Sequence, residues 1–176
     1  MVFPSNYLGE SMQKIMAFVV MLLLASCAPA PKSIGEFREA MSGHPAMMKE
    51  ESHNINRDFS VIVKDVERKS KECLQFGYST STRAGASART NTVVYHPHIR
   101  MNGKNKAEMF IQEEHIPQPA GSPKGGAYIF LADIKQVTFA KTQIIMYGPS
   151  FPTWQPIFDA IKGWSEGKNI KCPDSP

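Results

Sequence analysis

The segment TWQPIFDAIKGW, residues 153–164 of a chain of 176 residues, is the clearest indication of how this sequence folds. Large apolar side chains recur in it at helical spacing, so it predicts an amphipathic helix with one broad apolar stripe. Thr153 can cap this helix, and Pro156 is tolerated in the first turn. Because such a stripe cannot remain in water, we expect the helix to lie across the face of a sheet. The stripe consists of Trp154, Ile157, Phe158, Ile161 and Trp164.

The sequence before this helix is rich in β-branched and aromatic residues, which is typical of strands. Residues 127–132 form a continuous apolar run that predicts a central strand, and residues 142–147 should pair with it. We expect the last helix to contact the sheet face built around Ile129, Leu131 and Ile145. Further strands are predicted at residues 47–55, 75–81, 90–100 and 106–116, with a small, polar hairpin tip at residues 79–90.

Two more helices are predicted towards the N-terminus. Residues 57–74 carry apolar side chains on one face, with Asn56 as a candidate cap. Residues 34–41, capped by Ser33, form a shorter helix that either docks on the domain or lies near a membrane surface; we favour docking. The order of helix, strands and helix predicts an α+β two-layer sandwich with about four to five antiparallel strands. In element order alone it is loosely similar to helix-grip folds, in which a curved antiparallel sheet wraps a long C-terminal helix.

The beginning of the chain is typical of an export signal. Lys14 precedes an uninterrupted apolar run at residues 15–25, which is shorter than the roughly 20 residues needed to span a bilayer core. A basic residue followed by a short apolar run and small residues indicates a secretory signal peptide. A buried core helix is the alternative, although no polar residue interrupts the run. Met12 is a second candidate start of translation, because Met12-Gln13-Lys14 is a more usual beginning of a signal peptide than residues 1–11.

The apolar run ends in Leu24-Ala25-Ser26-Cys27, which resembles the lipobox of bacterial lipoproteins. The resemblance covers the first 27 residues. It implies that the Cys27 sulfur receives a diacylglyceryl group, that Cys27 becomes the first residue, and that its acyl chains anchor the protein. Residue 28 is alanine and not the aspartate that retains some members in the inner membrane. The resemblance therefore implies the periplasmic face of the outer membrane, with a signal peptide at 1–26, a tether at 27–33 and one domain at 34–176.

If Cys27 carries lipid, two of the three cysteines remain, Cys73 and Cys172. The periplasm is oxidising, and two leftover thiols usually pair there. We therefore expect a Cys73–Cys172 disulfide, which would close a loop of about 100 residues. Two free buried thiols are the alternative.

Few residues in the chain suggest chemistry. His96 and His98 lie on one strand face, but a metal site needs a third ligand. If the hairpin turn is centred on Asn102-Gly103, His96 faces Met109, His98 faces Ala107, and His115 lies too far along the ladder to join them. Cys73 lies at the C-terminal end of its predicted helix, whereas activated thiols lie at helix N-termini, where the helix dipole lowers the thiol pKa. We identify no catalytic signature and expect no metal or cofactor.

The composition and motifs together favour a binding function. The chain has 20 Lys and Arg against 16 Asp and Glu, a mixed and small excess that does not indicate nucleic acid. We expect a lipid-anchored, non-enzymatic periplasmic protein that binds an apolar ligand or a partner protein. An accessory structural subunit of an outer-membrane complex and an envelope hydrolase are the alternatives. A ligand site, if present, is expected under the last helix, lined by Trp154, Phe158, Ile161 and Trp164.

Overall fold

The computed structural model describes residues 30–43, 47–84 and 87–174. Residues 31–176 form one unit of the structure, and the predicted signal peptide at residues 1–26 lies outside the described residues. The described elements are α2 (Ile34–Gly43), β1 (Met48–Ile55), α3 (Phe59–Cys73), β2 (Gly77–Ala84), β3 (Ser87–Met101), β4 (Lys106–Ile116), β5 (Ala127–Thr138), β6 (Lys141–Pro149), the 3₁₀ turn η1 (Pro152–Trp154) and α4 (Gln155–Ser165).

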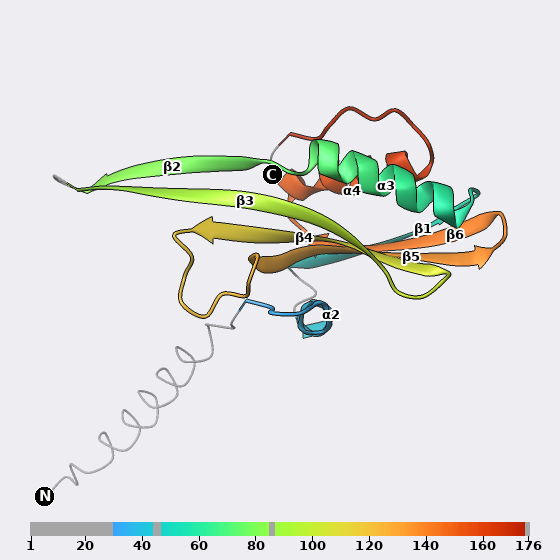
Figure 1. The fold of residues 1–176 in the computed structure, drawn as a ribbon, viewed down its shortest axis with the longest axis horizontal. Helices are drawn as coiled ribbons and strands as arrows, with labels where there is room; N and C mark the ends of the chain where they lie inside the picture. The colour runs from blue at the N-terminus through green and yellow to red at the C-terminus, as the bar shows by residue number, and fades with distance from the viewer. Residues whose placement is uncertain (1–29, 44–46, 85–86, 175–176) are drawn as a thin grey trace, which may run out of the picture. The chain divides into compact units, whose positions relative to one another are not determined.

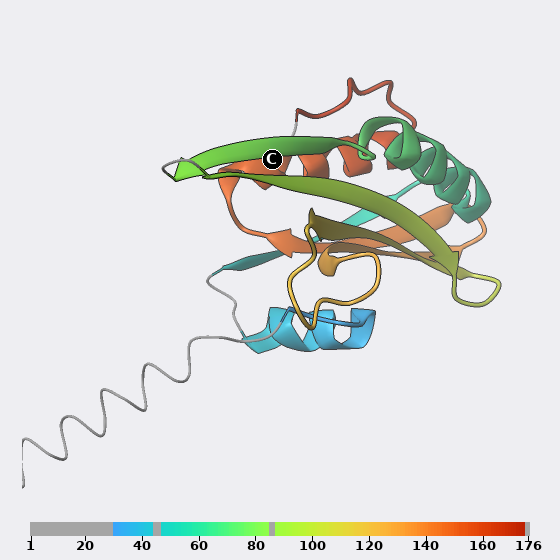
Figure 2. The ribbon, with the colours of Figure 1, turned by 60° about the vertical axis from the view of Figure 1, so that its left-hand side comes forward.

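The strands form one curled antiparallel sheet in the order β1-β6-β5-β4-β3-β2. Strands β2 to β6 follow one another as a meander, and β1 joins the sheet beside β6. Helices α3 and α4 cover one face, whereas α2 lies against the other (Figures 1 and 2). The α+β class and the antiparallel sheet are confirmed. The strand number is six, not four to five, and α2 adds a partial third layer to the predicted two.

The core between the sheet and the two longer helices contains the predicted apolar faces. In α3, the buried residues are those predicted from spacing, but its N-cap is Asp58, which accepts from the backbone N–H of Ser60 and Val61. In α4, Phe158 is 0% exposed, and its ring meets Phe130 edge-on at a centroid distance of 5.1 Å. The start of α4 follows a 3₁₀ turn with no side-chain cap, so the predicted Thr153 cap is wrong.

The sheet face that α4 contacts differs from the predicted one. Phe130 and Met146 point into the core with α4, whereas Leu131 packs with Ile34 and Phe37 of α2 on the opposite face. Ile145 lines a pocket beside Arg38 on that opposite face. The expected face around Ile129, Leu131 and Ile145 is therefore wrong for Leu131 and Ile145, whereas Ile129 packs against the core that includes α4. The cause is that β5 is buried on both faces, so its apolar run does not alternate.

The segment predicted as a hairpin tip is a regular β-ribbon. Strands β2 and β3 pair from Gly77–Val94 to Ala84–Ser87. Hydroxyl pairs bridge the strands, Ser79 with Thr92 at 2.8 Å and Ser81 with Thr90 at 3.1 Å. Cross-strand hydroxyl pairs of this kind stabilise sheets, which explains how small polar residues extend the ribbon.

The register of β3 against β4 also differs from the prediction. His96 pairs with Gln112 and His98 with Phe110, three residues from the expected partners. The chain does not turn in two residues at Asn102-Gly103. Residues 102–105 connect the strands, Gly103 takes φ 91°, and the Asn102 N–H donates to the Lys106 carbonyl. The longer connection therefore changes the pairing partner of every residue in the β3–β4 ladder.

Candidate functional site

The ligand site expected under the last helix is not open, because the four side chains expected to line it are packed in the core. Trp154 stacks near the Phe130 ring at 6.4 Å, and Phe158 and Ile161 are fully buried. Gly148 in β6 allows this close packing, because a Cβ there would lie 2.8 Å from the Phe130 ring. Trp164 is 1% exposed, although its edge borders a small surface pocket with Asp65 and Lys168.

An apolar groove lies on the opposite face of the sheet, beside α2. Its volume is about 290 Å³, close to the lower end of the roughly 300–1,000 Å³ usual for small-molecule sites. None of the side chains that line it is charged. We call it the α2 groove; its lining residues are Pro31, Phe37, Ala40, Met47, Met48, Tyr128, Ile129 and Pro149.

Four separate segments bring these residues together. Helix α2 begins after Ser33, whose hydroxyl accepts from the Glu36 backbone N–H at 3.1 Å, so the predicted Ser33 cap is confirmed. Phe37 in α2 is 2% exposed and packs on Leu131 of β5, which confirms docking as the place of this helix. At the sheet edge, Met48 of β1 pairs with Pro149 of β6. The groove lies where the helix meets this edge.

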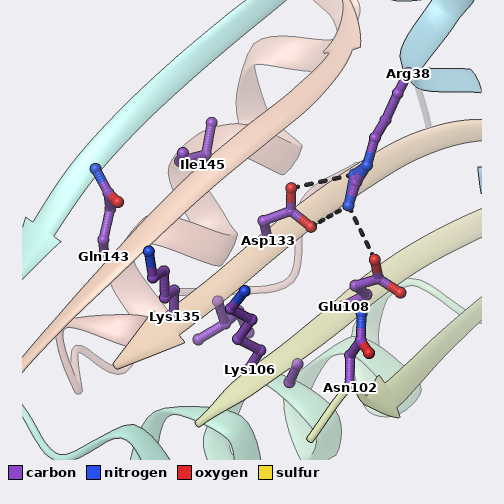
Figure 3. Close-up of a pocket in the computed structure, with 10 residues that line it drawn as sticks. Arg38, Asn102, Lys106, Glu108, Asp133, Lys135, Gln143 and Ile145 are labelled. Atoms are coloured by element: carbon purple, nitrogen blue, oxygen red, sulfur yellow. Dashed lines mark hydrogen bonds and ion pairs between the residues drawn. The ribbon is translucent and has the colours of Figure 1, made fainter. Parts of the chain in front are cut away.

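A charged cluster fastens α2 to the sheet next to the groove. Arg38 donates to both carboxylate oxygens of Asp133, at 2.5 and 3.2 Å, and to Glu108 at 3.0 Å. Arg100 donates to the other oxygen of Glu108 at 2.6 Å. Arg38, Glu108 and Asp133 border an open pocket of about 270 Å³, shown in Figure 3. Each carboxylate has an arginine partner, so the cluster orients α2 and provides no unpaired acid.

The environment of Asp133 supports this structural role. Burial raises the pKa of the Asp133 carboxyl above its usual range, and the neighbouring Arg38 guanidinium opposes that rise. A half-buried carboxylate of this kind depends on its arginine partner to remain charged. Arg38 therefore compensates a charge in the sheet at the same time as it positions the helix that forms one wall of the groove.

The histidines that suggested metal binding have other partners. His96 Nε2 lies 3.0 Å from Glu114, and the His98 ring stacks on Phe110 at 5.2 Å. Burial lowers the pKa of His98. His115 lies beside Glu113, at 2.6 Å, and pairs across the ladder with Val93. Among the described residues, no group of three or more His, Cys, Asp or Glu side chains is arranged to hold a metal.

The structure places two of the three cysteines. Cys73 and Cys172 are joined by a disulfide with a Cα–Cα separation of 5.0 Å, as predicted. The bond links the end of α3 to the segment after α4. Cys27 and the lipobox-like sequence lie outside the described residues. Within the described ranges, no helix is long and apolar enough to cross a membrane.

Comparison of the chain with models of known protein families, and with curated proteins, found no match. The sequence and the geometry of the described residues therefore carry what can be inferred about function. Sequence reasoning missed the α2 groove, because its lining residues come from distant segments without a shared motif. One signal pointed to it: the continuous apolar run of β5 requires a covering layer on each face of the sheet.

Proposed function

We propose that this protein is a lipid-anchored, non-enzymatic binding protein of a bacterial cell envelope, held at the periplasmic face of the outer membrane. The anchor proposal is supported by the lipobox-like Leu24-Ala25-Ser26-Cys27 after a short apolar run. The disulfide is consistent with an oxidising compartment, since such bonds are rare in reducing ones. Acyl chains on Cys27 would hold the domain at a membrane through the short tether that precedes α2.

The ligand proposal is carried by one observation, the uncharged α2 groove. Methionine, phenylalanine and proline side chains provide most of its wall, with Tyr128 as the one hydroxyl-bearing side chain among the lining residues. Methionines adapt their shape to an apolar ligand more readily than branched side chains. The groove is open at the surface, where Met47 is 57% exposed. A single acyl chain or a similarly slender apolar molecule is the ligand class that fits this volume and lining.

Filling the groove should weaken ligand binding without unfolding the protein. Ala40 lies in α2 at the groove wall, and an Ala40→Trp substitution would occupy the space that a ligand needs. We expect this variant to bind a fluorescent long-chain fatty acid at least about tenfold more weakly, equivalent to about 1.4 kcal/mol. Fluorescence titration of the chain from residue 30 measures this, after a melting curve has shown cooperative unfolding of both proteins.

The matched control is Ala88→Trp, which adds the same side chain to an exposed position in the β2–β3 ribbon, on the opposite side of the sheet from β1 and β6. The control should bind as tightly as the parent. Equal affinities for the parent and Ala40→Trp, or no measurable affinity in the parent, would contradict the proposed function.

A further inference from the structure

Two neighbouring hairpins at one end of the sheet combine exposed apolar side chains with lysines. The β3–β4 connection begins after Met101, and the β5–β6 connection contains Phe139; the Gln136 N–H donates to the Asn105 carbonyl and joins the two. Figure 1 shows both connections at the same end, beyond the start of α3. We call this surface the hairpin-tip cluster; it comprises Met101, Lys104, Lys106, Val137, Phe139 and Lys141.

The apolar members of the cluster are unusually exposed. Phe139 is 86% exposed, Met101 is 52% exposed and Val137 is 50% exposed. A single apolar residue at a surface needs no explanation, but three on adjoining tips, all left exposed by the described part of the chain, indicate a contact surface. Phenylalanine at the tip of a hairpin is well placed to enter the boundary between lipid headgroups and acyl chains.

The two connections carry basic and no acidic side chains. No acidic residue occurs at residues 101–107 or 134–142, while Lys104, Lys106 and Lys141 lie in or beside the two connections. Lys106 also faces Lys135 directly across the β4–β5 ladder, an arrangement of like charges that costs stability. The nearest acids on these strands, Glu108 and Asp133, are already paired with Arg100 and Arg38. An anionic partner would relieve the repulsion between the lysines.

We propose that the hairpin-tip cluster binds an anionic phospholipid bilayer, with Phe139, Val137 and Met101 inserted at the interface and the lysines on lipid phosphates. Apolar insertion and attraction of basic side chains by anionic lipids reinforce each other at a membrane surface. This contact is separate from acylation of Cys27 and from ligand binding in the α2 groove. It would orient the domain on the bilayer, as a second point of attachment.

The test uses the full chain, with a tryptophan placed in the β5–β6 connection as a fluorescent reporter. Phe139→Trp and the control Phe151→Trp each replace an exposed phenylalanine; Phe151 follows β6 at the other end of the sheet and is 52% exposed. Each chain is reconstituted into vesicles of phosphatidylcholine alone or with phosphatidylglycerol, with and without brominated acyl chains. The native tryptophans are buried in the core and give the same background in all variants.

With phosphatidylglycerol present, the emission of Phe139→Trp should move to shorter wavelength and be quenched by brominated lipid, while Phe151→Trp should be unaffected. Adding Lys104→Glu, Lys106→Glu and Lys141→Glu to Phe139→Trp should remove most of the quenching, whereas arginine at the same positions should preserve it. The proposal is overturned if Phe139→Trp is not quenched, if both tryptophans are quenched equally, or if quenching is independent of phosphatidylglycerol.

Discussion

Truncation of Phe158 to alanine is expected to lower the free energy of unfolding by about 3–5 kcal/mol, as for large aromatic side chains in closed cores. Phe158 is completely buried between α4 and the sheet, with Phe130 edge-on at 5.1 Å and the Lys49 ammonium 5.2 Å from its ring centroid. The surrounding strands cannot collapse easily into the space left behind. Thermal or urea unfolding, monitored by circular dichroism, measures the change.

The matched control is Phe151→Ala, which removes the same side chain from an exposed position just before α4. Its effect should stay within about 0.5 kcal/mol, as for most surface substitutions. If Phe158→Ala unfolds at the same denaturant concentration as the parent, the packing of α4 on the sheet is wrong. If Phe158→Ala instead binds the ligand more weakly and is as stable as the parent, the ligand site lies under the last helix, as expected from the sequence.

Loss of the disulfide is the second large effect. The double variant Cys73→Ser, Cys172→Ser should be less stable by about 2–5 kcal/mol, because the bond closes a loop with a sequence separation of 99 residues. The chain after α4 is held by this bond and by further contacts that include Ile170 against Gly163 and the Trp164 indole N–H donating to the Ile170 carbonyl. Urea unfolding of the double variant and the oxidised parent measures the difference.

A reducing agent provides the control for this prediction. Reduction should destabilise the parent by a similar amount and leave the double variant unchanged. Two titratable thiols in the untreated mature protein, with identical unfolding in the presence and absence of reductant, would show that Cys73 and Cys172 are not bonded.

Much of the architecture follows from local sequence patterns, and the differences have specific causes. The faces of α3 and α4 were predicted because one side of each helix is buried and the other solvated, which gives a clear period. Strand β5 is buried on both faces, by α4 on one side and by α2 on the other, so its apolar run could not show which way Leu131 points. The Asn102-Gly103 pair alone predicts a tighter turn than the chain makes, because Lys104 and Asn105 also belong to the connection.

The candidate site was less accessible from sequence than the fold. Met48 and Tyr128 are 80 positions apart in the chain, and the pairing of β1 with β6, which in turn pairs with β5, brings them to the same part of the sheet. Neither residue belongs to a motif. By contrast, the wide stripe of α4 suggested a ligand site because it is so apolar, yet the same residues fill the core completely. An apolar stripe predicts burial, but whether side chains or a ligand fill the space depends on the opposing surface.

Mass spectrometry of the N-terminal peptide of the protein purified from a bacterial envelope tests whether Cys27 carries a lipid anchor. We expect the peptide to begin at Cys27 and to carry the mass of a thioether-linked diacylglyceryl group and an N-acyl chain. Cys27→Ser, the matched variant, should lose this mass and remain uncut or appear in the soluble fraction. A mature protein with another N-terminus, or an unmodified Cys27 in a protein that stays in the membrane fraction, would contradict the account.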